Sequence, residues 1–218
     1  MAEWLKKWGA YLRNRKFLVS LGVAFLLLIA SIVITYFAII YATDKSSGPV
    51  TDIILSNIPV FDVDGIFLYG PVIFWIIMLG YTFSDPKRVP FTFKTIALFL
   101  VIRSIFISLT HIGPFIPNVF VNSPGISGIL SVFSSGNDLF FSGHTGLPLL
   151  LALIFWDNKN VRVFCLVSSL FFGAIVLMAH LHYSIDVFGA FFITYSIFCI
   201  AEKFFKADQE TLSKGLVA

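Results

Sequence analysis

The chain has 218 residues, of which 58% are hydrophobic and only 12% charged, and its mean hydropathy is +0.92. A soluble domain carries about 25% charged residues, so this composition excludes an ordinary water-soluble domain and indicates that lipid is the main solvent. The formal net charge of +3 is too small, in so apolar a chain, to suggest nucleic acid as a partner.

Six apolar stretches are long enough, or nearly so, to cross the bilayer, which takes about 20 helical residues. They cover residues 17–42, 65–83, 91–112, 142–156, 161–181 and 185–205. The fourth stretch is short, so its helix could begin within the preceding segment. The first exceeds the roughly 7–15 apolar residues of a signal peptide, and we interpret it as a retained span.

The basic residues alternate from loop to loop and predict an orientation. The segment after the first span holds four Asp against Lys45, and residues 113–141 hold no Lys or Arg. The basic clusters fall in the other loops: Lys6, Lys7, Arg13, Arg15 and Lys16; Lys87 and Arg88; Lys159 and Arg162; Lys203, Lys206 and Lys214. We therefore expect an all-α integral membrane bundle of six transmembrane helices with both termini in the cytoplasm. It would be one domain, with a basic arm (1–16), a core (17–205) and a cytoplasmic tail (206–218).

Polar motifs interrupt the apolar pattern at one face of this expected bundle. The fourth stretch is preceded and opened by Asp138-Leu-Phe-Phe-Ser-Gly-His144-Thr, and the link before the sixth reads His180-Leu-His182-Tyr-Ser-Ile-Asp186. Both motifs fall at the extracytoplasmic face in the expected topology. Arg103 lies in the outer half of the third stretch, with Thr110 and His111 closer to that face.

These residue types suit phosphoryl transfer. A neutral His182 can act as a nucleophile if the Asp186 carboxylate fixes its tautomer, and a four-residue spacing places both side chains on one helix face unless a turn brings them together. His144 can serve as a general acid. Ser142 and Gly143 lie near a helix N-terminus, which favours anions, and the planar guanidinium of Arg103 matches a phosphate. Such a site needs no metal and no other cofactor.

The two motifs together resemble the type 2 phosphatidic acid phosphatase (PAP2) superfamily, which has Ser-Gly-His in one motif and His-x-x-x-Asp in the next. The likeness is closest to the sphingomyelin synthase branch, which shows Gly-Asp-x-x-x-Ser-Gly-His-Thr, His-Tyr-Thr-x-Asp and an upstream Arg followed by Thr and Pro. It covers about residues 103–195. Asn137 stands in place of the branch's Gly and Ser184 in place of its Thr, and the Lys-x-x-x-x-x-x-Arg-Pro motif of the broader group is absent.

The resemblance implies a role for each matching residue. His182 attacks phosphorus and forms a phosphohistidine-type intermediate, Asp186 orients it, and His144 protonates the leaving alkoxide and then activates the acceptor. The acceptor is water in a phosphatase or a lipid hydroxyl in a headgroup transferase.

The expected partners are the bilayer, a phospholipid or lipid phosphate, and a lipid alcohol acceptor. The expected location is a bacterial inner membrane, with the site facing the periplasm. Further candidates for supporting the site are Asp138, His180, Tyr183 and Thr110.

Other interpretations of the same residues stay open at this point. We lean towards headgroup transfer over hydrolysis of phosphatidate or an isoprenoid diphosphate, and the rival from another class is a non-enzymatic transporter. His144 and His182 could be interfacial histidines, as could His111. Arg103 could pair structurally with Asp138, which could itself cap a helix. A metal site is disfavoured because His180 and His182 would splay apart on a helix and no acidic or Cys cluster completes a coordination shell.

Overall fold

The computed structural model describes residues 2–117 and 139–216, and all regular structure in those ranges is helical. Five of the helices are α1 (Ala2–Leu12), α2 (Arg15–Asp44), α3 (Asp64–Phe83), the short 3-10 helix η1 (Pro86–Arg88) and α4 (Val89–Leu109). The remaining ones are α6 (Gly143–Ile154), α7 (Lys159–Met178), α8 (Ser184–Phe204) and α9 (Lys206–Lys214). The all-helical prediction is confirmed for this part of the chain.

Five of the helical segments described are long and apolar enough to cross a membrane: α2, α3, η1 with α4, α7 and α8. They correspond to five of the six expected stretches. The sixth, α6, has 12 residues and therefore rises only about 18 Å, less than the roughly 30 Å of the hydrocarbon core. The count of six spans and the cytoplasmic placement of both termini stay predictions.

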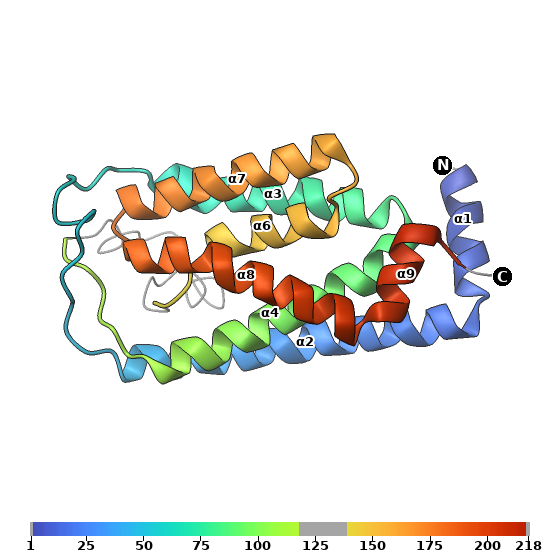
Figure 1. Cartoon of the computed structure of the whole chain (residues 1–218), viewed down its shortest axis with the longest axis horizontal. Coiled ribbons are helices and arrows are strands. Elements are labelled where there is room, and N and C mark those ends of the chain that lie inside the picture. The colour runs from blue at the N-terminus through green and yellow to red at the C-terminus, as the bar shows by residue number, and fades with distance from the viewer. Residues whose placement is uncertain (1, 118–138, 217–218) are drawn as a thin grey trace.

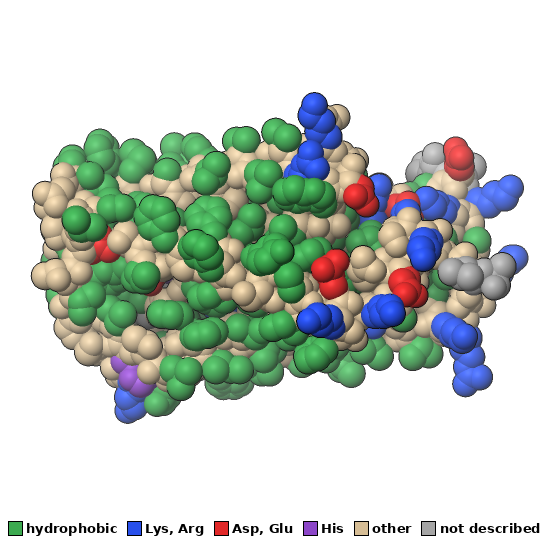
Figure 2. Space-filling view, viewed as in Figure 1, with side chains coloured by type: hydrophobic (Ala, Val, Ile, Leu, Met, Phe, Trp, Pro, Cys, Tyr) green, Lys and Arg blue, Asp and Glu red, His purple; other side chains and the backbone are tan. Residues whose placement is uncertain are grey.

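The long helices lie side by side, and the chain reverses direction from each to the next (Figure 1). The ends of α2, α4 and α7 therefore meet the starts of α3, α6 and α8 at one end of the bundle, here called the site end. At the other end, here called the basic end, α1 and α9 lie across the helix termini. Most of the Lys and Arg side chains visible in Figure 2 gather at the basic end.

The apolar sequence explains how the helices pack. Ala24, Ala38 and Ala42 of α2 are buried, and small residues let neighbouring helices approach closely. Thr35 of α2 and Ser104 of α4 meet at 3.0 Å between their hydroxyl oxygens. Large apolar side chains such as Leu26, which is 66% exposed, cover the outer surface of α2. That exposure is expected of a helix that faces lipid.

Short polar side chains fix where several helices begin. Asn14 accepts a hydrogen bond from Phe17 N–H at the start of α2, and Asn158 accepts one from Val161 N–H at the start of α7. Such caps satisfy N–H groups that have no partner within the helix. At the other boundary, α4 ends at Leu109, three residues before the expected 112, because Thr110 adopts an extended conformation.

The predicted basic arm contains α1 and the predicted tail contains α9, and side-chain contacts hold both helices at the basic end. Lys7 of α1 pairs with Asp85 at 2.6 Å. Lys94 of α4 pairs with Asp208 of α9 at 2.6 Å, and Ser20 of α2 contacts the same carboxylate. The Lys94–Asp208 pair is buried. These contacts anchor the two terminal helices to the helices that they cross.

Candidate active site

The start of α6 carries the first polar motif. Ser142 caps this helix, with its hydroxyl oxygen accepting a hydrogen bond from Thr145 N–H at 3.4 Å, and Gly143 and His144 form the first turn. The two residues before it, Phe140 and Phe141, have φ angles of 125° and 21°. Such conformations cost about 1–3 kcal/mol each. The entry to α6 is therefore a strained turn directly beside the motif.

Arg103 reaches this turn from the second half of α4. Its side chain is buried, and its Nε–H donates to the Phe141 carbonyl at 3.2 Å. A Cβ added to Gly143 would lie 3.5 Å from that Nε. The guanidinium therefore lies against the first turn of α6, so a fixed positive charge stands beside a helix N-terminus. Asp138, the other partner considered for Arg103, lies outside the residues that the structure describes.

The second motif places His182 and Asp186 in contact. His182 Nδ1 lies 3.2 Å from Asp186 Oδ2, and both side chains are buried. The same carboxylate oxygen accepts Tyr183 N–H at 3.0 Å. Of the two arrangements that the sequence left open, a shared helix face or a turn, the structure has the turn: His182 lies in the link between α7 and α8, and Asp186 lies in the first turn of α8. With Nδ1–H donating to the carboxylate, Nε2 carries the lone pair that a nucleophile needs.

One backbone hydrogen bond joins the two motifs. Ser142 N–H donates to the Asp186 carbonyl at 2.9 Å. The N-terminus of α6 and the first turn of α8, which are more than 40 residues apart in the chain, are thereby held together at the site end. Their proximity agrees with the sequence-based expectation that both motifs share one face.

A pocket of about 230 Å³ opens beside this junction. Arg103, Gly143 and His144 form its polar wall. The rest of the lining is apolar and consists of Pro71, Phe74, Trp75, Leu147, Pro148 and Phe172. His144 also packs against Phe67 of α3, with ring centroids 4.6 Å apart. His182 is not among the lining residues, so the pocket holds the proposed acid and phosphate binder but stops short of the proposed nucleophile.

Tyr183, a predicted supporting residue, connects three segments. Its hydroxyl donates to the Gly113 carbonyl at 2.8 Å and accepts Val50 N–H at 3.1 Å. Burial raises the pKa of this phenol above its usual value, which keeps it neutral and able to donate. Tyr183 therefore holds the link that carries His182 against the segments that follow α2 and α4.

Asp52 is a supporting residue that the sequence reasoning missed. Its Oδ2 accepts Ser184 N–H at 2.7 Å and the Ser184 hydroxyl at 2.8 Å, and its Oδ1 accepts Ile54 N–H and Leu55 N–H. Although burial alone would raise the pKa of Asp52, these hydrogen bonds from Leu55, Ser184 and Ile54 lower it below the usual range. The sequence showed only an acid in a loop, since its partner Ser184 is 132 positions away.

The other predicted residues lie at the site end without touching the His182–Asp186 pair in any contact that the structure describes. His180 sits in a turn with φ 57°, its Nδ1 lies 3.1 Å from the Pro117 carbonyl, and its ring packs on Phe115. Thr110 ends α4 two turns beyond Arg103, about 10 Å along the axis. His111 packs on Tyr41.

Within residues 2–117 and 139–216, no group of three or more His, Cys, Asp or Glu side chains could hold a metal ion. His182 and Asp186 are paired with each other, and His180 faces a different segment.

Comparison with known families adds one finding. Residues 135–203 match the family model described as PAP2 superfamily C-terminal. The match supports membership of the PAP2 superfamily. It includes Ser142, Gly143, His144, His182 and Asp186, whereas Arg103 lies before it. No curated protein and no solved structure matched the chain.

For a PAP2-type chain the matched region suggests phosphatase or phosphotransferase activity on lipid phosphates. The five long apolar helices are consistent with a multi-pass membrane protein. The chemistry class predicted from the motifs therefore agrees with the family comparison.

Proposed function

We propose that this protein is a membrane lipid phosphotransferase that moves a phosphate-bearing headgroup from a phospholipid to a lipid alcohol through a phosphohistidine intermediate at His182. The observation that carries the proposal is the His182–Asp186 contact of 3.2 Å, held beside the start of α6 by the bond from Ser142 N–H. Two imidazoles, a carboxylate, an arginine and a helix N-terminus are thereby collected at one end of the bundle.

In the first step, His182 Nε2 attacks phosphorus while the bond from phosphorus to the leaving lipid oxygen breaks. Asp186 accepts the Nδ1–H and stabilises the positive charge that develops on the ring. His144 gives its proton to the leaving oxygen, so the lipid departs as an alcohol. Arg103 and the N–H groups at the start of α6 stabilise the negative oxygens of the transition state.

In the second step, the hydroxyl of the acceptor attacks the same phosphorus and the bond to His182 breaks. His144, left neutral by the first step, takes the proton of the acceptor and is ready for another cycle. Both steps exchange one P–O bond and one P–N bond, so the reaction requires no cofactor.

The pocket suits an amphiphile. A phosphate beside Arg103 and His144 would place a hydrocarbon chain along Phe74, Trp75 and Leu147. His182 is only 5% exposed and lies outside the lining. The proposal therefore requires the 179–183 link to open, or the phosphate to move beyond the present pocket, before attack.

The proposed acceptor rests on the motif likeness to the sphingomyelin synthase branch, in particular His182-Tyr183 and Arg103 with Thr110. Hydrolysis is the second candidate, since Asn137 and Ser184 depart from the branch's pattern and the family comparison reaches only the superfamily. The proposed location is an inner membrane with the site facing the periplasm, in agreement with the alternation of basic loops.

The deciding experiment incubates purified protein with headgroup-labelled phospholipids, with and without ceramide or diacylglycerol. A labelled new lipid that forms only when the alcohol is added supports transfer. Release of inorganic phosphate from phosphatidate, unaffected by either alcohol, supports hydrolysis. Absence of any reaction across the panel, with folded protein, contradicts both.

Metal independence is tested in the same assay. Orthovanadate, which mimics the trigonal-bipyramidal transition state, is expected to inhibit turnover, and EDTA is expected to leave it unchanged. Activity that is lost in EDTA and restored by added zinc would contradict a reaction carried by the histidines alone.

A further inference from the structure

A second pocket, of about 900 Å³, opens at the basic end of the bundle. Its walls come from the ends of α3, α6 and α8, from the start of α7, and from η1, α4 and α9. No residue assigned to the proposed reaction lines it. The reaction at the site end therefore does not account for this pocket.

Three cations line the pocket. The ammonium groups of Lys87 and Lys159 have no hydrogen bond or ion pair within the residues that the structure describes. Arg88 is fixed in place, because its Nη1 donates to the Tyr81 carbonyl and the Ser84 hydroxyl at 2.7 Å each and its guanidinium stacks on Tyr81 at 3.9 Å. The pocket thus has one rigid and two adaptable positive charges.

The N-terminus of α7 adds hydrogen-bond donors to the same wall. Asn158 caps this 20-residue helix through Val161 N–H. Lys159 and Asn160 also line the pocket, and their backbone N–H groups have no partner among the described residues. First-turn N–H groups of a helix cannot be satisfied within it and bind anions well. Together with the three cations, these N–H groups give the lining of the pocket several donors that suit an anion.

The remaining lining fits the other parts of a phospholipid. Phe91, Leu153 and Phe198 provide an apolar wall. Trp156 and Tyr195 also line it and are 49% and 59% exposed, and such residues concentrate at the headgroup level of membranes. Asp157 and Glu202 are acceptors for hydroxyl groups but would repel additional negative charge.

We propose that this pocket binds an anionic phospholipid with a hydroxyl-bearing headgroup, from the leaflet at the basic end, and that this lipid is not turned over. Its phosphate would meet Lys87, Lys159 and the α7 N-terminus, while its hydroxyls would meet Asp157 and Glu202.

The test uses full-length His182→Ala protein in detergent micelles, so that binding does not depend on turnover. Phosphatidylglycerol carrying a fluorophore on one acyl chain is the probe, and its anisotropy reports binding. The double variant Lys87→Gln/Lys159→Gln is expected to bind on the order of tenfold more weakly, because each basic side chain near a lipid surface contributes to attraction.

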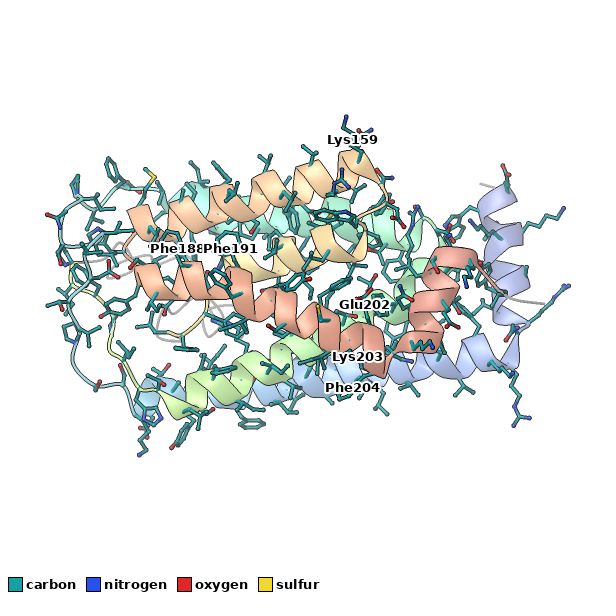
Figure 3. The ribbon with its side chains drawn as sticks, in the orientation of Figure 1. Lys159, Phe188, Phe191, Glu202, Lys203 and Phe204 are labelled. Carbon is teal, nitrogen blue, oxygen red and sulfur yellow. The ribbon has the colours of Figure 1, made fainter. Side chains whose placement is uncertain are left out.

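Lys203→Gln is the matched control. Lys203 is exposed on α8 at the same end of the bundle (Figure 3) but does not line the pocket. Unchanged binding to the double variant, or an equal loss in Lys203→Gln, would overturn the proposal. Displacement of the probe by soluble glycerophosphate as readily as by phosphatidylglycerol would do so too, because recognition would then ignore the lipid chain.

Discussion

At the residue scale, the contact between His182 and Asp186 is the chemical centre of the proposed reaction. The carboxylate oxygen that lies 3.2 Å from His182 Nδ1 also accepts Tyr183 N–H. This single carboxylate oxygen therefore fixes both the His182 imidazole and the backbone of the next residue. Removal of the negative charge would leave the histidine without the partner that stabilises its cation.

We expect Asp186→Asn to lower kcat by about a hundredfold or more, since the histidine loses tautomer control and charge stabilisation. The measurement is initial rate against substrate concentration. Asp44→Asn is the control, because Asp44 is exposed and, among the described residues, pairs with its neighbour Lys45 alone. Wild-type turnover in Asp186→Asn would contradict the role assigned to the carboxylate.

Asp52 gives a second prediction at this scale. Asp52→Asn replaces a charged carboxylate, which only accepts hydrogen bonds, by a neutral amide that also donates them. Hydrogen bonds to a charged group contribute about 1.5–3 kcal/mol to folding stability. We expect a clearly lower Tm at neutral pH than in Asp44→Asn.

The pH dependence of this difference has a definite sign. Because folding lowers the pKa of Asp52, its carboxylate stabilises the fold above the unfolded-state pKa of about 3.9. That stabilisation is lost as the pH falls through the folded-state pKa. The Tm gap between wild type and Asp52→Asn should therefore be constant from neutral pH down to about pH 5 and narrow below about pH 4. A gap that widens on acidification would show that the carboxylate is not the stabilising form.

At the element scale, α6 is held by close packing. A Cβ added to Gly146 would lie 2.8 Å from the Phe99 ring of α4 and 2.8 Å from the Thr194 hydroxyl of α8. The start of α6, with Ser142 and His144, depends on this approach. The glycine is therefore required by contact between three helices and not by its own backbone conformation.

We expect Gly146→Ala to destabilise the protein by about 1–3 kcal/mol through overpacking, seen as a lower Tm in detergent. Gly189→Ala on α8 is the matched control, because its added Cβ would meet only Ile193 at 3.9 Å. Alanine has the higher helix propensity at both positions, so only a steric clash can separate them. Equal Tm values for the two variants would argue against tight packing around α6.

The sequence predicted the elements better than their junctions. Apolar length alone located the ends of α2, α3, α4, α7 and α8 to within three residues, because a bilayer requires about 20 apolar residues. The motif spacing predicted the His182–Asp186 pair and left open whether a shared helix face or a turn forms it. The supporting contacts of Asp52 and of the Tyr183 hydroxyl were not predictable, since they join residues 132 and 70 positions apart through loops with no periodic pattern.

At the scale of the whole molecule, the two ends of the bundle differ in chemistry. The histidine motifs lie at the site end, and most basic residues gather at the basic end (Figure 2). The positive-inside rule predicts that the basic end faces the cytoplasm. A lipid phosphate would then react at the outer leaflet, while the pocket beside Lys159 would face the inner one.

This orientation is testable with single cysteines in intact cells. Cys165 and Cys199 are first replaced by Ala, and Asn57→Cys at the site end is compared with Lys214→Cys at the basic end. A membrane-impermeant maleimide is expected to label position 57 in intact cells and position 214 only after the cells are opened. The reverse pattern would place the proposed active site in the cytoplasm.

The central claim is that His182 carries the phosphoryl group during turnover. Wild-type protein is mixed with phospholipid labelled in its phosphate, quenched rapidly in alkali to preserve phosphohistidine, and digested for mass spectrometry. We expect a labelled, acid-labile adduct on the peptide that contains His182, and its absence in His182→Asn. Turnover at the wild-type rate in His182→Asn, or label on a different residue, would contradict it.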